Sequence, residues 1–575
     1  MRFIMSRATI ILSTIVLLLS LATFVAAVEN PLCPGEGVFY NPSNGEDIVV
    51  PSGYRVSVFA SGLNFPTGIA FRGNRHRFEV LVLESGHGLP SRCNDETLIP
   101  GGEFAPSNPF TPDILVFDQS GTLIAGPLAK PSASGVGFQP HGPAIDIAFE
   151  HGFHGGRLFA TDSNAAIRTV GGGNNSSRIV IVDPNTGAVT PFITGLPTGD
   201  HPSEQLAFKG EFIYWSQGST TNSGVVGHDN GGGANQQDIP CQDITLSNNT
   251  FDSGPPDGHH TSGYSRHGVA RPGATVHAFE SATGPGICDG AILRARLHVR
   301  DPKATIEPFS WGYRNPYGIR FAPDDHALKG GLFVTENGED ERGARPTNNA
   351  PDRLQLAQQN PDGSPDYHGW PDRFGFLDST QALFNPVGGP GDDCVLCSKG
   401  KPVKPILARP PQQITAPLAI EPADVAAVGT DFVPDSFVRG PVHRGAALVS
   451  REGDFGFSAA NGKPEEGHDI QLVNFSRPGK PLQLKLQRFA HNTTFEQAFV
   501  SGARGINRPT TVMFGPDECA YLVDYGAVRD FGKSDPDSKF KVDGDGPLLQ
   551  IPGTGTIWKI CSVAGEVRGQ IEEDD

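Results

Sequence analysis

The feature that most constrains the fold of this sequence is a short phrase that recurs along the chain. Each copy has a small or proline-containing approach, a β-rich triplet that ends in Phe, a turn, and a second β-rich run. Six copies share this pattern, and they begin at Pro66, Gly142, Pro202, Asn315, Arg508 and, in a weaker form, His443. Each copy is typical of a hairpin of two short strands.

Six hairpins distributed over the whole chain predict an all-β fold, a six-bladed β-propeller with long inserted loops. A β-sandwich is the alternative, but it gives no reason for one phrase to return around the whole chain. The 72 Gly and 50 Pro among 575 residues exclude a helical bundle or a coiled coil. Phe outnumbers Tyr and Trp (36 against 9 and 4), so we expect Phe to fill the apolar layers between blades.

Two long segments rich in Gly, Pro, Asn and Asp, about residues 226–290 and 355–440, separate some of the copies. We expect these insertions to project from one face and to wall a substrate cleft. The last apolar run, near residues 554–560, is expected to pair with the early run that begins at Tyr54. That pairing would close the ring of blades and remove exposed strand edges.

The N-terminus indicates the compartment. Residues 1–27 contain Arg2 and Arg7, then an apolar run, then small residues up to Ala27, which is typical of a secretory signal peptide. A membrane anchor is the alternative, but the apolar run is shorter than a bilayer span requires. We therefore predict a secreted protein, extracellular or periplasmic, with no membrane span after signal removal. The propeller is expected over residues 28–565, followed by an acidic tail over residues 566–575.

Charge and cysteine content narrow the partners and the redox state. The formal net charge of −18 argues against nucleic acid as a partner. All eight cysteines follow the cleavage point, so structural disulfides are the leading interpretation in an oxidising compartment. Cys394 and Cys397 lie in a Gly/Pro-rich loop, where a disulfide is favoured over a zinc or redox site. The sequence alone does not reveal how the cysteines pair.

Polar residues that flank the repeated phrases are the candidates for function, because propellers gather strand ends around their axis. Four groups meet this criterion, namely His201 after Asp200, Asn222, the pair Arg314 and Asn315, and Arg508. Each one alone has an ordinary structural explanation as a hydrogen-bonded His or a turn anchor. Together they supply a base, guanidinium groups and amides, which suits an anionic ligand on the axis and a proton acceptor beside it.

The segments YRNPYGIRFAPD, GGLFVTENG, YHGWPD and RPTTVMFGPD, in this order, resemble the soluble quinoprotein glucose/sorbosone dehydrogenases. The resemblance covers nearly all of the mature chain. It implies a six-bladed propeller that holds pyrroloquinoline quinone (PQQ) on its axis together with Ca²⁺. It also implies a small-molecule sugar substrate and an external electron acceptor.

Residue roles follow from the same resemblance. His201 corresponds to the catalytic base that takes a hydroxyl proton while hydride passes to the quinone. Arg314 and Asn315 correspond to the residues that contact the quinone oxygens, and the resemblance gives Arg314 a catalytic role as well. Asn222 borders the site, and Arg508 corresponds to an Arg that binds a cofactor carboxylate. Calcium in the family is held partly by backbone carbonyl groups, which here belong to Gly338 and Glu339.

The chain also departs from the family pattern at several positions. His141 and Tyr317 stand where the glucose dehydrogenases have Gln, and Glu339 stands where they have Pro. The cofactor-binding Lys of the fifth copy is not evident, and Arg451 is the candidate to replace it. His141 and Arg451 therefore join the candidate cofactor-binding residues, and glucose itself is not implied as the substrate.

Three functional hypotheses remain open. The first is a secreted quinoprotein oxidoreductase that oxidises a hydroxyl group of a sugar or polyol. The second, motivated by these departures, is a non-catalytic extracellular propeller that binds glycans or proteins. The third is a calcium-dependent lactonase, but the repeated phrases lack the Asn, Asp and Glu set of a central calcium site. His259, His260 and His267 in the first insertion are a further metal candidate, although solvated loop residues are the favoured interpretation.

Overall fold

The computed structural model describes residues 40–86, 110–132, 136–140, 142–164, 175–227, 236–253, 259–341, 343–387, 398–413, 415–453, 466–529 and 549–563, with short strand pairs at 28–29, 37–38, 534–535 and 541–542. Residues 1–27, expected to be a signal peptide, and residues 566–575, expected to be an acidic tail, lie outside the described residues. His141 and the pair Cys394 and Cys397 also lie outside them.

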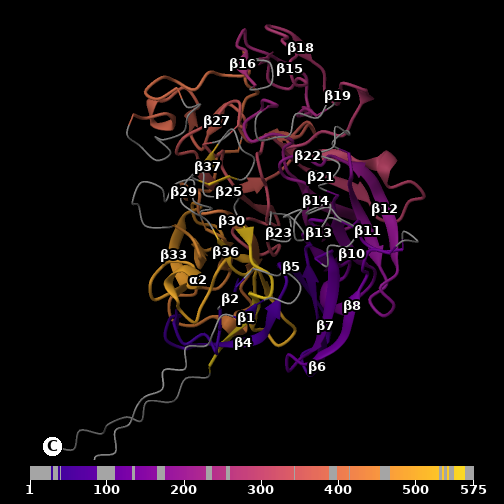
Figure 1. The fold of residues 1–575 in the computed structure, drawn as a ribbon, viewed down its shortest axis with the longest axis vertical. Helices are drawn as coiled ribbons and strands as arrows, with labels where there is room; N and C mark the ends of the chain where they lie inside the picture. The colour runs from indigo at the N-terminus through magenta and orange to yellow at the C-terminus, as the bar shows by residue number, and fades with distance from the viewer. Residues whose placement is uncertain are drawn as a thin grey trace, which may run out of the picture.

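The predicted six-bladed propeller is confirmed, because the described strands form six antiparallel sheets of the size expected for blades (Figure 1). Blade one comprises β5 (Pro66–Asn74), β6 (Arg77–Glu84), β7 (Asp113–Asp118) and β8 (Leu123–Leu128). Blade two comprises β9 (Ile147–Phe149), β10 (Leu158–Asp162), β11 (Ser177–Val182) and β12 (Val189–Leu196). Blade three comprises β13 (Ser203–Lys209), β14 (Phe212–Gln217), β21 (Ala291–Arg296) and β22 (Glu307–Trp311). Blade four comprises β23 (Ile319–Phe321), β24 (Leu332–Glu336), β25 (Pro351–Ala357) and β29 (Ala419–Ala423). Blade five comprises β30 (Ala427–Phe432), β31 (Ala447–Arg451), β32 (Asp469–Phe475) and β33 (Leu484–Asn492). Blade six comprises β34 (Pro509–Phe514), β35 (Ala520–Asp524), β40 (Gly555–Ser562) and β4 (Tyr54–Leu63).

Short elements decorate this ring. Blade three gains β26 (Asp366–Tyr367), and blade five gains β3 (Ile48–Val49). Small hairpins pair β1 (Val28–Glu29) with β2 (Gly37–Val38), β15 (Ile244–Thr245) with β18 (Thr275–Val276), β16 (Phe251–Asp252) with β17 (His260–Thr261), β19 (Glu280–Ser281) with β20 (Gly284–Pro285), β27 (Arg373–Phe374) with β28 (Leu377–Asp378), β36 (Val528–Arg529) with β39 (Leu549–Gln550), and β37 (Ser534–Asp535) with β38 (Lys541–Val542). The helical elements are α2 (Ala498–Ser501) and the 3-10 turns η3 (Gly152–His154), η5 (Lys303–Thr305), η6 (Ala382–Phe384) and η7 (Asp435–Phe437). Within the described ranges, no helix has the length and apolar character needed to cross a bilayer.

One Phe per blade holds neighbouring blades together, as the Phe content predicts. The Phe that ends each inner strand packs onto the preceding blade: Phe71 contacts Tyr521 of blade six at 4.9 Å between ring centroids, and Phe321 contacts Tyr214 of blade three at 5.0 Å. The six equivalent residues are Phe71, Phe149, Phe208, Phe321, Phe432 and Phe514. Because side chains alternate along a strand, the residue before each Phe faces the following blade instead.

The fifth blade differs from the sequence expectation. Its inner strand is β30, and the weak copy at His443 belongs to the second strand, β31. The motif AVGTDF of β30 escaped detection because Gly429 and Asp431 interrupt its apolar pattern. Gly429 is required there, since a Cβ atom would lie 2.7 Å from the Thr510 carbonyl oxygen of the next blade. The second insertion is therefore shorter than residues 355–440, because β29, β30 and the end of β25 fall inside that range.

The ring closes as predicted, by pairing of the early strand β4 with the late strand β40 in blade six. Strand β40 lies antiparallel between β35 and β4, with Tyr54 opposite Ser562. A disulfide between Cys519 and Cys561 fastens β40 to the start of β35, and a second links Cys241 to Cys288 in the first insertion. These four cysteines confirm the disulfide prediction for the part of the chain that the structure describes.

The two insertions gather at one end of the molecule. Figure 1 shows their strands β15, β16, β18, β19 and β27 together at the top of the view. A shared apolar cluster that includes Tyr264, Trp370 and Leu407 joins them. Within it, the buried ion pair of Arg345 and Asp372 (2.8 Å) fixes the second insertion, because a charge at this depth needs its partner.

Polar side chains cross the middle of the propeller axis. Nε2 of Gln205 on β13 donates to Oγ1 of Thr511 on β34 at 3.1 Å, and blades three and six are opposite in a ring of six. Beside them, the carboxylate of Asp146 accepts the backbone N–H of Leu206 at 3.0 Å. Its other oxygen has no hydrogen-bond partner among the described residues. Burial raises the pKa of Asp146 to about 7.

We predict that Asp146→Asn changes the pH dependence of stability. Between about pH 4 and pH 7 the folded protein retains a proton on Asp146 that the unfolded chain releases, so the free energy of unfolding falls as pH rises through this window, by of the order of 4 kcal/mol. The Asp146→Asn variant has no carboxyl group to lose a proton, so its free energy of unfolding does not fall for this reason. In thermal unfolding, its melting temperature should therefore rise relative to that of the wild type between pH 4.5 and pH 8. The exposed Asp324→Asn serves as control, and parallel pH profiles for the wild type and Asp146→Asn would contradict the prediction.

Candidate functional site

Most of the candidate residues converge at the end of the axis where the inner strands begin, which we call the His201 mouth. The chain enters β13 through His201, whose backbone N–H donates to the Ser219 carbonyl at 3.1 Å. The N–H of Ser219 in turn donates to the Arg314 carbonyl at 2.8 Å. Gly218 permits this approach, because a Cβ atom there would lie 2.2 Å from Cβ of His201. Backbone contacts thus bring His201, which precedes blade three, close to Arg314, which precedes blade four.

A network of charged groups then links the side chains of four residues, namely His201, Asp200, Arg314 and Asp340. Nδ1 of His201 lies 3.3 Å from Oδ2 of Asp200, and the same oxygen lies 3.6 Å from Nη2 of Arg314. Nη2 of Arg314 also contacts Oδ2 of Asp340 at 2.5 Å. The Asn222 amide closes the network, since it donates to the Asp340 carbonyl and accepts the Asp340 N–H, both at 3.0 Å. A histidine held by a carboxylate beside a fixed guanidinium is suited to proton transfer next to developing negative charge.

Asn315 belongs to a second, uncharged chain of hydrogen bonds. Its amide oxygen faces the two carboxyl oxygens of Glu204 at 2.7 and 2.9 Å. Burial raises the pKa of Glu204 well above its ordinary value, which favours the neutral acid that can donate to this oxygen. Asn315 then donates to Oδ1 of Asn337 at 2.9 Å, and Asn337 donates to the Ala427 carbonyl at 2.7 Å. The amide that faces the axis is therefore rigidly oriented.

Arg508 lies fully buried on the other side of the axis. Its backbone N–H donates to Asp524 at 2.8 Å, and Nη1 donates to the Gly453 carbonyl at 3.0 Å. Glu452 stands next to this contact, and burial raises its pKa to about 7 while the charge of Arg508 opposes the rise. The mouth therefore combines two guanidinium groups with carboxyl groups of which some are protonated near neutral pH.

Gly338 and Glu339 follow β24 and are buried. The N–H of Gly338 donates to Asp352 at 2.7 Å. Both carboxyl oxygens of Glu339 are buried and have no hydrogen-bond partner among the described residues, while Nη2 of Arg353 lies 4.0 Å away. Burial raises the pKa of Glu339 to about 8. Across the described ranges, no group of three or more His, Cys, Asp or Glu side chains is arranged to hold a metal ion, and this includes His259, His260 and His267.

The structure shows the surroundings of two residues that differ from the family pattern, Arg451 and Tyr317. Arg451 on β31 binds Asp469 through two nitrogens (2.6 and 2.5 Å) and Glu421 through a third (3.2 Å), so its guanidinium is engaged within blade five. Tyr317 is buried on the axis and packs with Ile145 and Val428.

Sequence reasoning missed Asp340, Glu204 and Glu452. Each lies one to three residues from a repeated phrase or from a predicted residue, so proximity to the phrases was the available signal. Asp340 lies 118 residues from its partner Asn222, however, and only the folded ring brings the two together.

No family model matches the sequence, and no curated protein matches it. Solved structures with a related fold include the calcium structure of a Trichoderma reesei protein of Carbohydrate-Active Enzymes Family AA12, at 14% identity over 92% of this chain and 99% of that chain, with a TM-score of 0.46. They also include the soluble aldose sugar dehydrogenase of Escherichia coli in its apo form (13%, 89% and 100%, 0.45). A third is the PQQ-bound aldose sugar dehydrogenase of Streptomyces coelicolor (16%, 89% and 100%, 0.41). Likeness at this level carries no argument about the activity of this chain.

We predict that Gly218→Ala displaces His201. The added methyl group would overlap Cβ of His201, so the free energy of unfolding should fall by about 1–3 kcal/mol. Chemical denaturation measures the loss, and the ring resonances of His201 in NMR spectra should shift. Gly62→Ala is the control, because a Cβ atom there meets nothing within 4 Å and leaves only backbone strain. Unchanged His201 resonances in Gly218→Ala would contradict the prediction.

Proposed function

We propose that the protein is a secreted quinoprotein oxidoreductase that oxidises a hydroxyl-bearing carbon of a sugar or polyol, with PQQ and Ca²⁺ as cofactors and an external electron acceptor. The observation that carries the proposal is the network from His201 through Asp200, Arg314 and Asp340 to Asn222 at one mouth of the axis. The sequence motifs around Arg314 and Arg508 point to the same chemistry.

The residues at the His201 mouth fit an anionic, planar cofactor. Nε of Arg314 is buried without a hydrogen-bond partner among the described residues, so this guanidinium retains a donor. Burial raises the pKa of both Glu204 and Glu452, which favours their neutral forms and lowers the negative charge that would repel carboxylates. Arg314, Asn315, Asn222 and Arg508 would hold the cofactor. When bound, PQQ supplies the two-electron acceptor for hydride from the substrate carbon.

His201 serves as the base. Asp200 stabilises a proton on Nδ1, and the opposite ring nitrogen, Nε2, then accepts the substrate hydroxyl proton. The His201 side chain is 18% exposed, whereas that of Arg314 is 4% exposed, so the base can reach solvent-borne substrate while the guanidinium stays desolvated. A desolvated, fixed guanidinium stabilises developing negative charge more strongly than one in water.

Calcium would bind at the carbonyl groups of Gly338 and Glu339. Hard cations prefer oxygen ligands, and the two Glu339 carboxyl oxygens that lack hydrogen-bond partners among the described residues add suitable donors nearby. His141 remains a proposed cofactor contact. We assign no cofactor contact to Arg451, because its nitrogens already bind Asp469 and Glu421.

The engagement of Arg451 favours the second candidate, a non-catalytic propeller that binds glycans or proteins, since Arg451 is then not available to replace the missing Lys. Titration with PQQ in the presence of Ca²⁺ separates the two. A quinone absorbance change that saturates, followed by bleaching on addition of an aldose, supports the oxidoreductase. The absence of any quinone binding would exclude it.

We predict that His201→Ala lowers the turnover of the reconstituted protein about 10²–10⁴-fold, because the proton acceptor is lost. Steady-state dye reduction with a panel of aldoses and polyols measures the effect. PQQ affinity should change little, since His201 acts on substrate. The matched control is His277→Ala, whose exposed side chain contacts Asp243 on the first insertion. Equal turnover of His201→Ala and the wild type would refute the assigned base.

We also predict that Ca²⁺ raises the melting temperature of the cofactor-free protein in a concentration-dependent manner, because a ligand that binds only the folded state stabilises it. Mg²⁺ should have a smaller effect, since it demands tighter geometry. Glu339→Gln should weaken the calcium effect, whereas the exposed Glu307→Gln should leave it intact. A melting temperature that is independent of Ca²⁺ would contradict calcium binding at this position.

A further inference from the structure

A cavity lies at the end of the axis opposite the His201 mouth, where the inner strands end, and we call it the Arg320 mouth. It has a volume of about 530 Å³, and the ends of all six inner strands contribute to its lining. Nothing in the proposed oxidoreductase chemistry uses this cavity. The Gln205–Thr511 hydrogen bond crosses the axis between the two mouths.

The six residues that precede the repeated Phe residues give the Arg320 mouth two different sides. On blades one to three they are all alanine, namely Ala70, Ala148 and Ala207, which leave space and an apolar wall. On blades four and five they are Arg320 and Asp431, and on blade six the residue is Met513. The strand residues therefore form an apolar wall on blades one to three and a charged wall on blades four and five, and the connection after β9 adds Glu150, His151 and His154 on the side of blade two.

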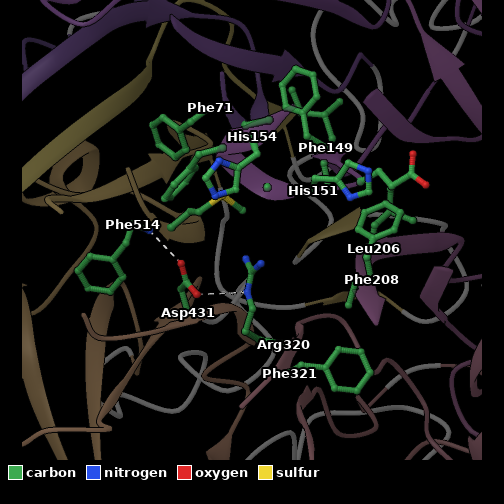
Figure 2. Close-up of a pocket in the computed structure, with 18 residues that line it drawn as sticks. Phe71, Phe149, His151, His154, Leu206, Phe208, Arg320, Phe321, Asp431 and Phe514 are labelled. Carbon is green, nitrogen blue, oxygen red and sulfur yellow. Dashed lines mark hydrogen bonds and ion pairs between the residues drawn. The ribbon is translucent and has the colours of Figure 1, made fainter. Parts of the chain in front are cut away.

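The charged side presents hydrogen-bond donors to the cavity. Nε of Arg320 is anchored, since it lies 3.3 Å from both the Thr430 carbonyl and Oδ1 of Asp431. Neither terminal nitrogen of Arg320 makes a hydrogen bond within the described residues. Figure 2 shows the guanidinium directed into the space between His151 and His154, whereas the Phe321 ring points away.

Asp431, in contrast, is already occupied as an acceptor. Its Oδ2 accepts the N–H of Phe514 at 3.0 Å, and its Oδ1 accepts the N–H of Phe432 at 2.9 Å. The remaining acid on the lining, Glu150, is bound bidentately by Arg157 at 2.9 Å. The hydrogen-bonding capacity that remains at this mouth is thus mainly that of donors, which matches an anion and not a cation.

From this geometry we propose that the Arg320 mouth is a binding site for a small aromatic carboxylate. The carboxylate makes two parallel hydrogen bonds to the terminal nitrogens of Arg320, and the aromatic body lies against the alanine wall and Met513. The volume is within the range of small-molecule sites, which are mostly apolar with a few fixed polar groups. The site is independent of the proposed oxidoreductase function.

Isothermal titration calorimetry on the full chain with 2-naphthoate tests the proposal. Saturable binding at one site is expected. Naphthalene-2-methanol, which lacks the charge, and acetate, which lacks the apolar body, should each bind at least about 10-fold more weakly, because each loses one of the two interactions that hold 2-naphthoate. The absence of saturable 2-naphthoate binding would overturn the proposal, as would equal affinity for naphthalene-2-methanol.

Two variants locate the site. Arg320→Gln should weaken 2-naphthoate binding at least about 10-fold, whereas Arg296→Gln, which removes an exposed Arg paired with Glu211 on blade three, should not. Ala148→Leu keeps Arg320 but fills the apolar side, and it should also abolish binding. If Arg320→Gln fails to fold, the affinity of Ala148→Leu for 2-naphthoate tests the assignment instead. Unchanged affinity in a folded Arg320→Gln or in Ala148→Leu would overturn the assignment.

Discussion

The structure depends above all on the packing of one Phe per blade onto the preceding blade. A four-stranded sheet buries little apolar surface by itself, so each blade needs a neighbour on both faces. The inner-strand Phe fills that interface at the narrowest part of the ring, with ring contacts such as Phe71 to Tyr521. Because its neighbour in the strand must face the opposite way, the same alternation places small or charged residues toward the next blade. The composition of the Arg320 mouth is a direct result.

The two ends of the axis differ because different segments of the chain line them. At the end where inner strands begin, the connections from the preceding blades arrive and carry His201, Arg314 and Arg508. At the end where they finish, the strands themselves supply most of the lining, and the connection from β9 to β10 adds residues 150–154. The His201 mouth therefore combines residues from several connections, whereas the Arg320 mouth has the pair Arg320 and Asp431 on its strands and Glu150, His151 and His154 on one connection.

Much of the fold was accessible from the sequence, because the Phe-ending phrase is local and repeats. Blade five was placed one strand too late, since Gly429 and Asp431 replace the apolar pattern to satisfy contacts with the next blade. In the site, the convergence of His201, Asn222, Arg314 and Arg508 follows from their equivalent positions in a ring. Asp340 could not be assigned in the same way, because its pairing with Arg314 and Asn222 depends on how loops from different blades meet. The engagement of Arg451 by Asp469 likewise depends on strand register.

The antiparallel pairing of Tyr54 with Ser562 has a consequence for how the protein is made. The strand that begins at Tyr54 leaves the ribosome early but finds its partner only when nearly the whole chain exists. Each doubling of loop length adds only about 0.6 kcal/mol of closure entropy, so the final ring loses little stability from this arrangement. The delay is kinetic, and blade six is necessarily the last to complete. Since β4 and β40 lie side by side in one sheet, a linker could join Tyr54 to Ser562 and new termini could be opened in another blade, which would let a different blade complete the ring.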